Sequence, residues 1–117
     1  MSASALAAQH CEPCAKGASP LSTQEARRML KEVKGWDLTD DGKSLEQEFL
    51  MKDFVAARDL INEITEAAQA EDHHPDLHLT DYRKLRIVLS THSIGGLSKN
   101  DFILAAKIDD LPKNLKG

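Results

Sequence analysis

Three histidines are the residues of this sequence best suited to proton transfer. His73 and His74 are adjacent and precede Pro75, and His92 follows a strand-like run rich in β-branched residues. Imidazole is the one side chain whose ordinary pKa lets it both donate and accept a proton near neutral pH. If the three rings meet in one cleft, acid–base chemistry is expected there.

Acidic residues near these histidines could orient a ring nitrogen. Glu71, Asp72 and Asp76 lie close to the adjacent pair in the sequence, and a carboxylate beside an imidazole favours its charged form. Asp101 has a structural explanation of its own, because it is the third residue after Ser98 and completes a capping-box pattern at a helix start. The sequence does not indicate which carboxylate serves the histidines.

Other interpretations of these residues remain open at this point. A polar Glu-Asp-His-His run is also typical of a solvated connection between a helix and a strand. Neutral imidazole binds zinc, copper or nickel, and Cys11 and Cys14 form a C-x-x-C pair that could supply half of a zinc site. A structural zinc usually needs four ligands, no second C-x-x-C pair is present, and adjacent histidines are awkward for chelating one ion. We therefore expect neither metal nor cofactor, and two reduced thiols on the surface.

The chain beyond Pro20 alternates between helical and strand-like patterns. Helical spacing of apolar residues, with polar caps, predicts three helices: Thr23 to near Lys34, a long helix after Asp53, and one from Ser98 to Pro112. Alternation predicts four strands: Trp36–Leu38, Ser44–Met51, Asp76–Thr80 and Arg83–Thr91. The order α-β-β-α-β-β-α, with one apolar face per strand, predicts an α+β fold: a four-stranded antiparallel sheet with three helices packed on one face.

This order of elements also places the histidines. Pro75 disfavours helical geometry at His74 and so marks the junction between the long helix and a strand. If the last two strands pair as neighbours, the start of the first lies beside the end of the second. His73 and His74 would then approach His92 at one edge of the sheet.

Length and charge limit the remaining possibilities. The 117 residues predict one domain over 21–117, preceded by a flexible or loosely docked tail over 1–20. The net charge of -4 offers no attraction for nucleic acid or an anionic membrane, and no apolar run approaches the roughly 20 residues that cross a bilayer. The start of the chain lacks the pattern of a secretory signal, so we expect a cytoplasmic protein. The second face of the sheet would meet solvent or another copy of the chain.

Several motifs together resemble the signature of the pterin-4a-carbinolamine dehydratases. They are Glu71-Asp72-His73-His74-Pro75, Tyr82, Ser90-Thr91-His92, Gly96-Leu97-Ser98 and Asp101. Outside this signature, Gly35-Trp36, Phe49, Lys52-Asp53-Phe54 and Leu104-Ala105 also stand where that family has similar residues. The resemblance extends over about residues 21 to 110 and leaves the two cysteines without a role.

The resemblance implies a dehydratase that converts 4a-hydroxytetrahydropterin, formed by aromatic amino acid hydroxylases, to quinonoid dihydropterin. It implies His73, His74 and His92 as catalytic residues, with Asp101, Glu71 and Pro75 in binding or structural support. Our hypothesis is that His74 and His92 transfer protons while His73 binds the hydroxyl. It further implies a homodimer or homotetramer and a functional link to a hydroxylase. The alternative is a non-catalytic binding module, a transcription-factor partner or an assembly chaperone, which would not need the intact histidine set.

Overall fold

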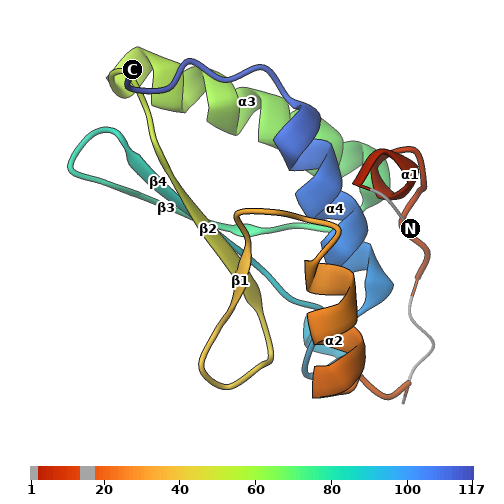
Figure 1. Cartoon of the computed structure of the whole chain (residues 1–117). Helices are drawn as coiled ribbons and strands as arrows, with labels where there is room; N and C mark the ends of the chain where they lie inside the picture. The colour runs from red at the N-terminus through yellow and green to blue at the C-terminus, as the bar shows by residue number, and fades with distance from the viewer. Residues whose placement is uncertain (1–2, 14–17) are drawn as a thin grey trace.

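The computed structural model describes residues 3–13 and 18–117, and its centre is a four-stranded antiparallel sheet (Figure 1). The strands are β1 (Asp37–Leu38), β2 (Leu45–Leu50), β3 (Asp76–Thr80) and β4 (Lys84–Leu89), in the spatial order β1-β2-β4-β3. Three main helices lie on one side of this sheet (Figure 1). The predicted α+β fold is confirmed.

The helices begin where the sequence places polar caps. They are α2 (Thr23–Leu30), α3 (Phe54–Glu71) and α4 (Lys99–Asp110). Ser22 and Ser98 each complete a capping box with the acidic residue three positions later, and Asp53 accepts the N–H of Ala56 at 2.8 Å. Each cap satisfies backbone donors that a helix start would otherwise leave unpaired.

The core lies between the sheet and the helices. The core cluster includes Leu45 on β2 and the alternate residues Leu85, Ile87 and Leu89 on β4, all fully buried, together with Ile64 of α3 and Phe102 of α4. Complete burial of one such side chain contributes roughly 1.5–3 kcal/mol. The other face of the sheet is exposed and carries charged side chains such as Arg86.

Several element ends differ from the prediction, and two of these differences affect the core or the surroundings of His92. The first main helix ends at Leu30, before the predicted Lys34, and continues as a turn in which Val33 is still buried. The last strand ends at Leu89, because the following chain closes a small loop in which Thr91 N–H donates to Gly96 O at 2.8 Å. His92 therefore begins a short 3-10 helix, η1 (His92–Ile94), instead of ending a strand.

Residues 3–13 belong to the segment that the sequence predicts as a flexible or loosely docked tail. A short helix, α1 (Ala3–Ala7), packs against α4, and the side chain of Leu6 is 0% exposed (Figure 1). Lys107 on α4 donates from Nζ to the carbonyl of Ala7 at 2.7 Å. Leu6 and the distant Lys107 both help to hold this helix in place. Contacts of this kind are not visible in the local periodicity of the sequence. Cys14 lies outside the described residues.

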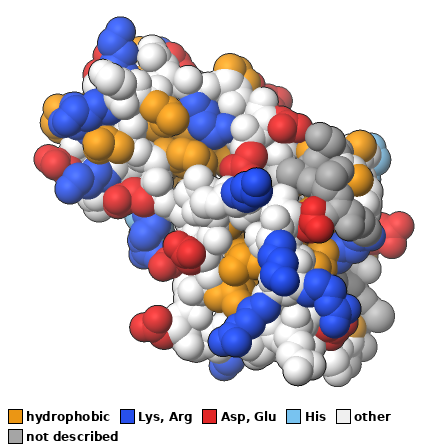
Figure 2. Space-filling view, viewed as in Figure 1, with side chains coloured by type: hydrophobic (Ala, Val, Ile, Leu, Met, Phe, Trp, Pro, Cys, Tyr) orange, Lys and Arg blue, Asp and Glu red, His pale blue; other side chains and the backbone are white. Residues whose placement is uncertain are grey.

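The face of the molecule in Figure 2 carries side chains of both charges, and the acidic and basic side chains are interspersed. Within residues 3–13 and 18–117, no helix is both long and apolar enough to cross a membrane.

Candidate active site

The C-terminal end of α3 places His73. Asp72 has a left-handed backbone, with φ 49° and ψ 42°, which aspartate tolerates better than most residues. The N–H of His73 then donates to the carbonyl of Ala68 at 3.2 Å, as in helix-terminating motifs. This turn directs the chain into β3 and leaves His73 mostly buried and His74 exposed.

Asp101 is the partner of His73. The Nε2 atom of His73 lies 2.6 Å from Oδ1 of Asp101, a side chain that is 0% exposed. The second oxygen, Oδ2, accepts the backbone N–H of Ser98 and the hydroxyl of Thr91, both at 2.9 Å. A carboxylate only accepts hydrogen bonds, so this geometry assigns the proton to Nε2 and leaves Nδ1 of the neutral ring as an acceptor. Asp101 therefore fills the predicted capping box and also orients a histidine.

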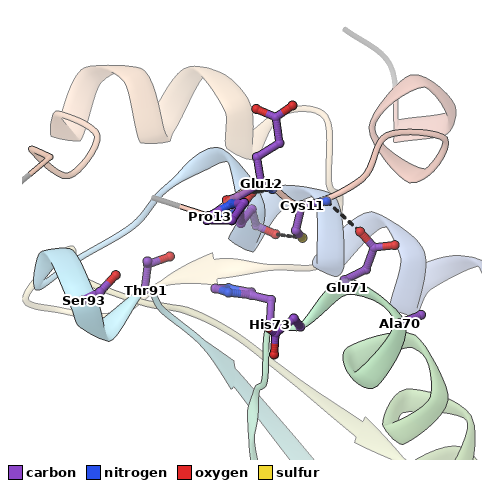
Figure 3. A pocket seen from close by; sticks show the side chains of 10 residues that line it. Cys11, Glu12, Pro13, Ala70, Glu71, His73, Thr91 and Ser93 are labelled. Carbon is purple, nitrogen blue, oxygen red and sulfur yellow. Dashed lines mark hydrogen bonds between the residues drawn. The ribbon is translucent and has the colours of Figure 1, made fainter. Parts of the chain in front are cut away.

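A cavity of about 490 Å³ opens beside this pair, within the size range of small-molecule sites. Figure 3 shows the ring of His73 pointing toward the side where Thr91 and Ser93 lie. The cavity is lined by Cys11, Glu12, Pro13, Ala70, Glu71, Asp72, His73, Thr91, Ser93 and Asn100. It thus joins the end of α3, the segment after β4, the start of α4 and the N-terminal segment.

The structure brings the three histidine-bearing segments to one edge of the sheet but does not turn all three rings into this cavity. Asp76 pairs with Val88, so β3 and β4 are neighbours as predicted. His74 is exposed, and its Nε2 lies 2.6 Å from Oε1 of Gln69. His92 is exposed and lines a second hollow of about 330 Å³.

Backbone geometry explains the different directions of these rings. Thr91 and Ser93 line the first cavity, while Ser90 and His92 line the second. The 3-10 turn that starts at His92 replaces the extended backbone predicted there, and Gly95 closes it with φ 72°.

Glu71 does not orient any of the three predicted histidines. Its Oε1 accepts the backbone N–H of Cys11 at 2.6 Å, and its Oε2 lies 2.8 Å from Nδ1 of His10 and 3.8 Å from Nζ of Lys107. Burial is the strongest single influence on the pKa of Glu71, and it opposes ionisation of the carboxyl group. The hydrogen bonds from His10 and Cys11 and the charge of Lys107 outweigh it and hold the pKa of Glu71 below its usual value.

The sequence analysis also missed the contribution of the N-terminal segment to this site. Cys11 is half-buried, and burial, followed by the charges of Glu71 and Asp101, raises the pKa of its thiol to about 12. The thiol is therefore protonated near neutral pH, and it lines the cavity as an uncharged group instead of acting as a nucleophile. In the part of the chain that the structure describes, no three His, Cys, Asp or Glu side chains are grouped so that they could hold a metal ion.

Comparison with known proteins shows the same family over most of the chain. Residues 19–111 match the family described as pterin 4 alpha carbinolamine dehydratase. A putative pterin-4-alpha-carbinolamine dehydratase of Halorhodospira halophila is 44% identical over 101 residues, which cover 86% of this chain and 92% of the relative. A protein with the same description from Methylococcus capsulatus is 40% identical over 111 residues, covering 95% and 96%.

A solved structure is also similar. The crystal structure of a transcriptional coactivator/pterin dehydratase from Brucella melitensis superposes with a TM-score of 0.73 at 27% identity, over 78% of this chain and 96% of that one. The chain belongs to the pterin-4a-carbinolamine dehydratase family.

Proposed function

We propose that this protein is a hydro-lyase that removes water from pterin-4a-carbinolamine and releases quinonoid dihydropterin. The family match and the descriptions of the relatives support the reaction. The observation that carries the assignment to a site is the His73–Asp101 pair at the wall of a cavity of about 490 Å³. This volume suits a flat bicyclic ligand with polar edges.

The reaction is an elimination, so it needs two proton transfers. One proton must reach the hydroxyl that leaves C4a as water, and one must depart from a nitrogen of the ring system. Imidazoles do both near neutral pH, and each well-placed acid or base contributes roughly 10²- to 10⁴-fold.

The surroundings of each histidine suggest different roles. His73 is fixed by a buried carboxylate, and its Nδ1 can accept the hydrogen of the substrate hydroxyl and so orient it. His74 and His92 are exposed, so they can exchange protons with solvent between turnovers. We therefore assign proton transfer to His74 and His92 and orientation of the hydroxyl to His73.

Single alanine variants test this assignment. The rate of carbinolamine loss, followed by absorbance, is expected to fall at least tenfold for His73→Ala, and by about 10²-fold or more for His74→Ala and His92→Ala. His78→Ala is the matched control, because His78 is an exposed histidine on β3 that lines none of the cavities described above. Wild-type rates in all three site variants would rule out histidine catalysis here.

A second candidate function is a binding module of the same fold. The Brucella melitensis structure is described as both a transcriptional coactivator and a pterin dehydratase, which is the observation that favours it. The two functions predict different results for the purified wild-type chain. Turnover of the carbinolamine supports the enzyme, whereas absence of turnover in a folded protein supports the module.

We also propose that the chain forms a homodimer or homotetramer. Phe54 and Val55 at the start of α3 are 59% and 52% exposed, and Leu115 is 46% exposed, so apolar side chains remain for a second copy to cover. Light scattering at micromolar concentration should give two or four times the mass of 12.9 kDa. The monomer mass at all concentrations would contradict this proposal.

A further inference from the structure

Residues 3–13, which we call the N-terminal strap, lie before the stretch that matches the family and form one wall of the candidate site. Cys11, Glu12 and Pro13 line the cavity together with His73 and Thr91. Figure 3 shows Cys11 and Pro13 on one side of this space and His73 on the other. The strap is therefore placed to contact any molecule that reaches His73.

Two side chains fix the strap where it borders the cavity. Asn100, near the start of α4, donates from Nδ2 to the carbonyl of Glu12 at 2.6 Å and accepts the N–H of Glu12 at Oδ1 at 3.0 Å. Glu71, the last residue of α3, accepts the N–H of Cys11 at 2.6 Å. Both side chains are nearly buried, at 9% exposure for the Asn100 residue and 5% for the Glu71 side chain. The bond to the Glu71 carboxylate is charge-assisted, and such bonds are among the stronger hydrogen bonds in proteins.

A second anchor lies further along the strap, away from the cavity. Leu6 is fully buried in the core cluster, and Lys107 binds the carbonyl of Ala7. Because the strap is held at residues 6–7 and again at 11–12, its cavity wall is ordered before any ligand arrives. A preordered wall loses little conformational entropy on binding, which favours affinity.

We propose that the N-terminal strap is part of the pterin site and sets how tightly the substrate is held, with Glu71 and Asn100 as positioning residues. This inference rests on the proposed function. The strap offers the neutral thiol of Cys11 and the ring of Pro13, which suit the face of a flat bicyclic ring. His73 lies on the opposite wall, and the proton-transferring residues His74 and His92 do not line this cavity, so the strap affects binding more than the chemical step.

Displacement of the strap tests the proposal, and Leu6→Asp does so from the anchor that does not line the cavity. Leu6→Asp places a charge in an apolar socket and should release the strap, and Glu71→Ala removes an anchor beside the cavity. Alkylation of Cys11 by iodoacetamide, read by peptide mass spectrometry, reports the release. The dissociation constant of 7,8-dihydropterin and the KM for the carbinolamine report the site.

The released variants should bind dihydropterin about tenfold more weakly and show a KM raised by a similar factor, with kcat within about twofold of wild type. A tenfold change corresponds to about 1.4 kcal/mol. Met51→Ala is the control, because it removes a fully buried side chain that lines none of the cavities described above and pairs with Leu115 near the C-terminus. The C-terminus lies far from α1 in Figure 1, so this variant should leave KM unchanged.

Two results would overturn the proposal, and they are distinguishable. Faster alkylation of Cys11 with unchanged KM and unchanged dihydropterin affinity would show that the strap is released but does not belong to the site. A wild-type chain that neither binds dihydropterin nor dehydrates the carbinolamine would overturn the proposed function itself, and the role of the strap with it. If Leu6→Asp does not fold, Glu71→Ala gives the same comparison.

Discussion

Replacement of Asp101 by asparagine separates its two structural tasks. The amide oxygen of asparagine can still accept the N–H of Ser98 and the hydroxyl of Thr91, so the start of α4 should remain capped. The amide nitrogen would then face Nε2 of His73, which lies 2.6 Å from the carboxylate in the wild type. An N–H donor at that position forces the ring of His73 to carry its proton on Nδ1.

The size of the effect follows from the exchange of a hydrogen bond to a charged carboxylate for a neutral bond of reversed direction. A hydrogen bond to a charged group contributes about 1.5–3 kcal/mol to stability when both partners are buried. Each 1.36 kcal/mol of transition-state stabilisation corresponds to a tenfold change in rate. We therefore expect Asp101→Asn to lower kcat by roughly 10- to 150-fold and to lower the free energy of unfolding by about 1.5–3 kcal/mol. Dehydration kinetics and urea unfolding of the same preparation measure the two quantities.

The control for this variant is Ser98→Ala. It removes the hydroxyl that accepts the N–H of Asn100 and contacts the hydroxyl of Thr91, but keeps the bond between His73 and Asp101. Loss of an N-cap costs about 1 kcal/mol, so stability should fall while kcat stays within about twofold. The reasoning fails if Asp101→Asn retains wild-type kcat while His73→Ala does not, because Asp101 would then be a helix cap alone.

Three further predictions concern titratable groups outside this pair. Because the pKa of Glu71 is lower in the folded state, its stabilisation is complete above the unfolded value of about 4.5 and is lost in acid. Acidification should therefore lower the free energy of unfolding, measured in urea, less for Glu71→Gln than for the wild type. Burial raises the pKa of Asp109, so ionisation of this carboxyl lowers the stability of the fold as pH rises. Asp109→Asn removes the charge and keeps an acceptor for the indole N–H of Trp36. The urea midpoint of this variant should exceed that of the wild type at neutral pH but not in acid. With a pKa of about 12, Cys11 should be alkylated at about pH 8 roughly three orders of magnitude more slowly than an ordinary thiol, and unfolding in urea should remove the difference.

Local patterns predicted the scaffold of this protein well. The range Asp76–Thr80 was predicted as a strand and is observed with those bounds, and the capping boxes at Ser22 and Ser98 are both formed. These features depend on residues within four positions of each other, so their physical causes are visible in the sequence. The pairing of β3 with β4 followed from the same alternation.

Long-range contacts could not be predicted in the same way. Glu71 was one of three carboxylates that could serve the neighbouring histidines, but its partners His10 and Cys11 lie 61 and 60 positions away. The direction of His92 depends on a 3-10 turn that the alternation before it does not indicate. Such contacts are set by how elements pack, and a single sequence carries little information about that packing.

The choice of aspartate at position 101 shows where local and long-range requirements meet. A capping box accepts either glutamate or glutamine at this position in its common form, so the helix alone does not demand aspartate. A glutamate carboxylate would extend about 1.5 Å further from the backbone. With Oδ2 already engaged by Ser98 and Thr91, only the shorter side chain leaves Oδ1 at 2.6 Å from Nε2 of His73 in a fully buried space. The residue that completes the capping box of α4 is therefore also the residue that sets the orientation of the buried histidine, and stability and activity should change together at this position.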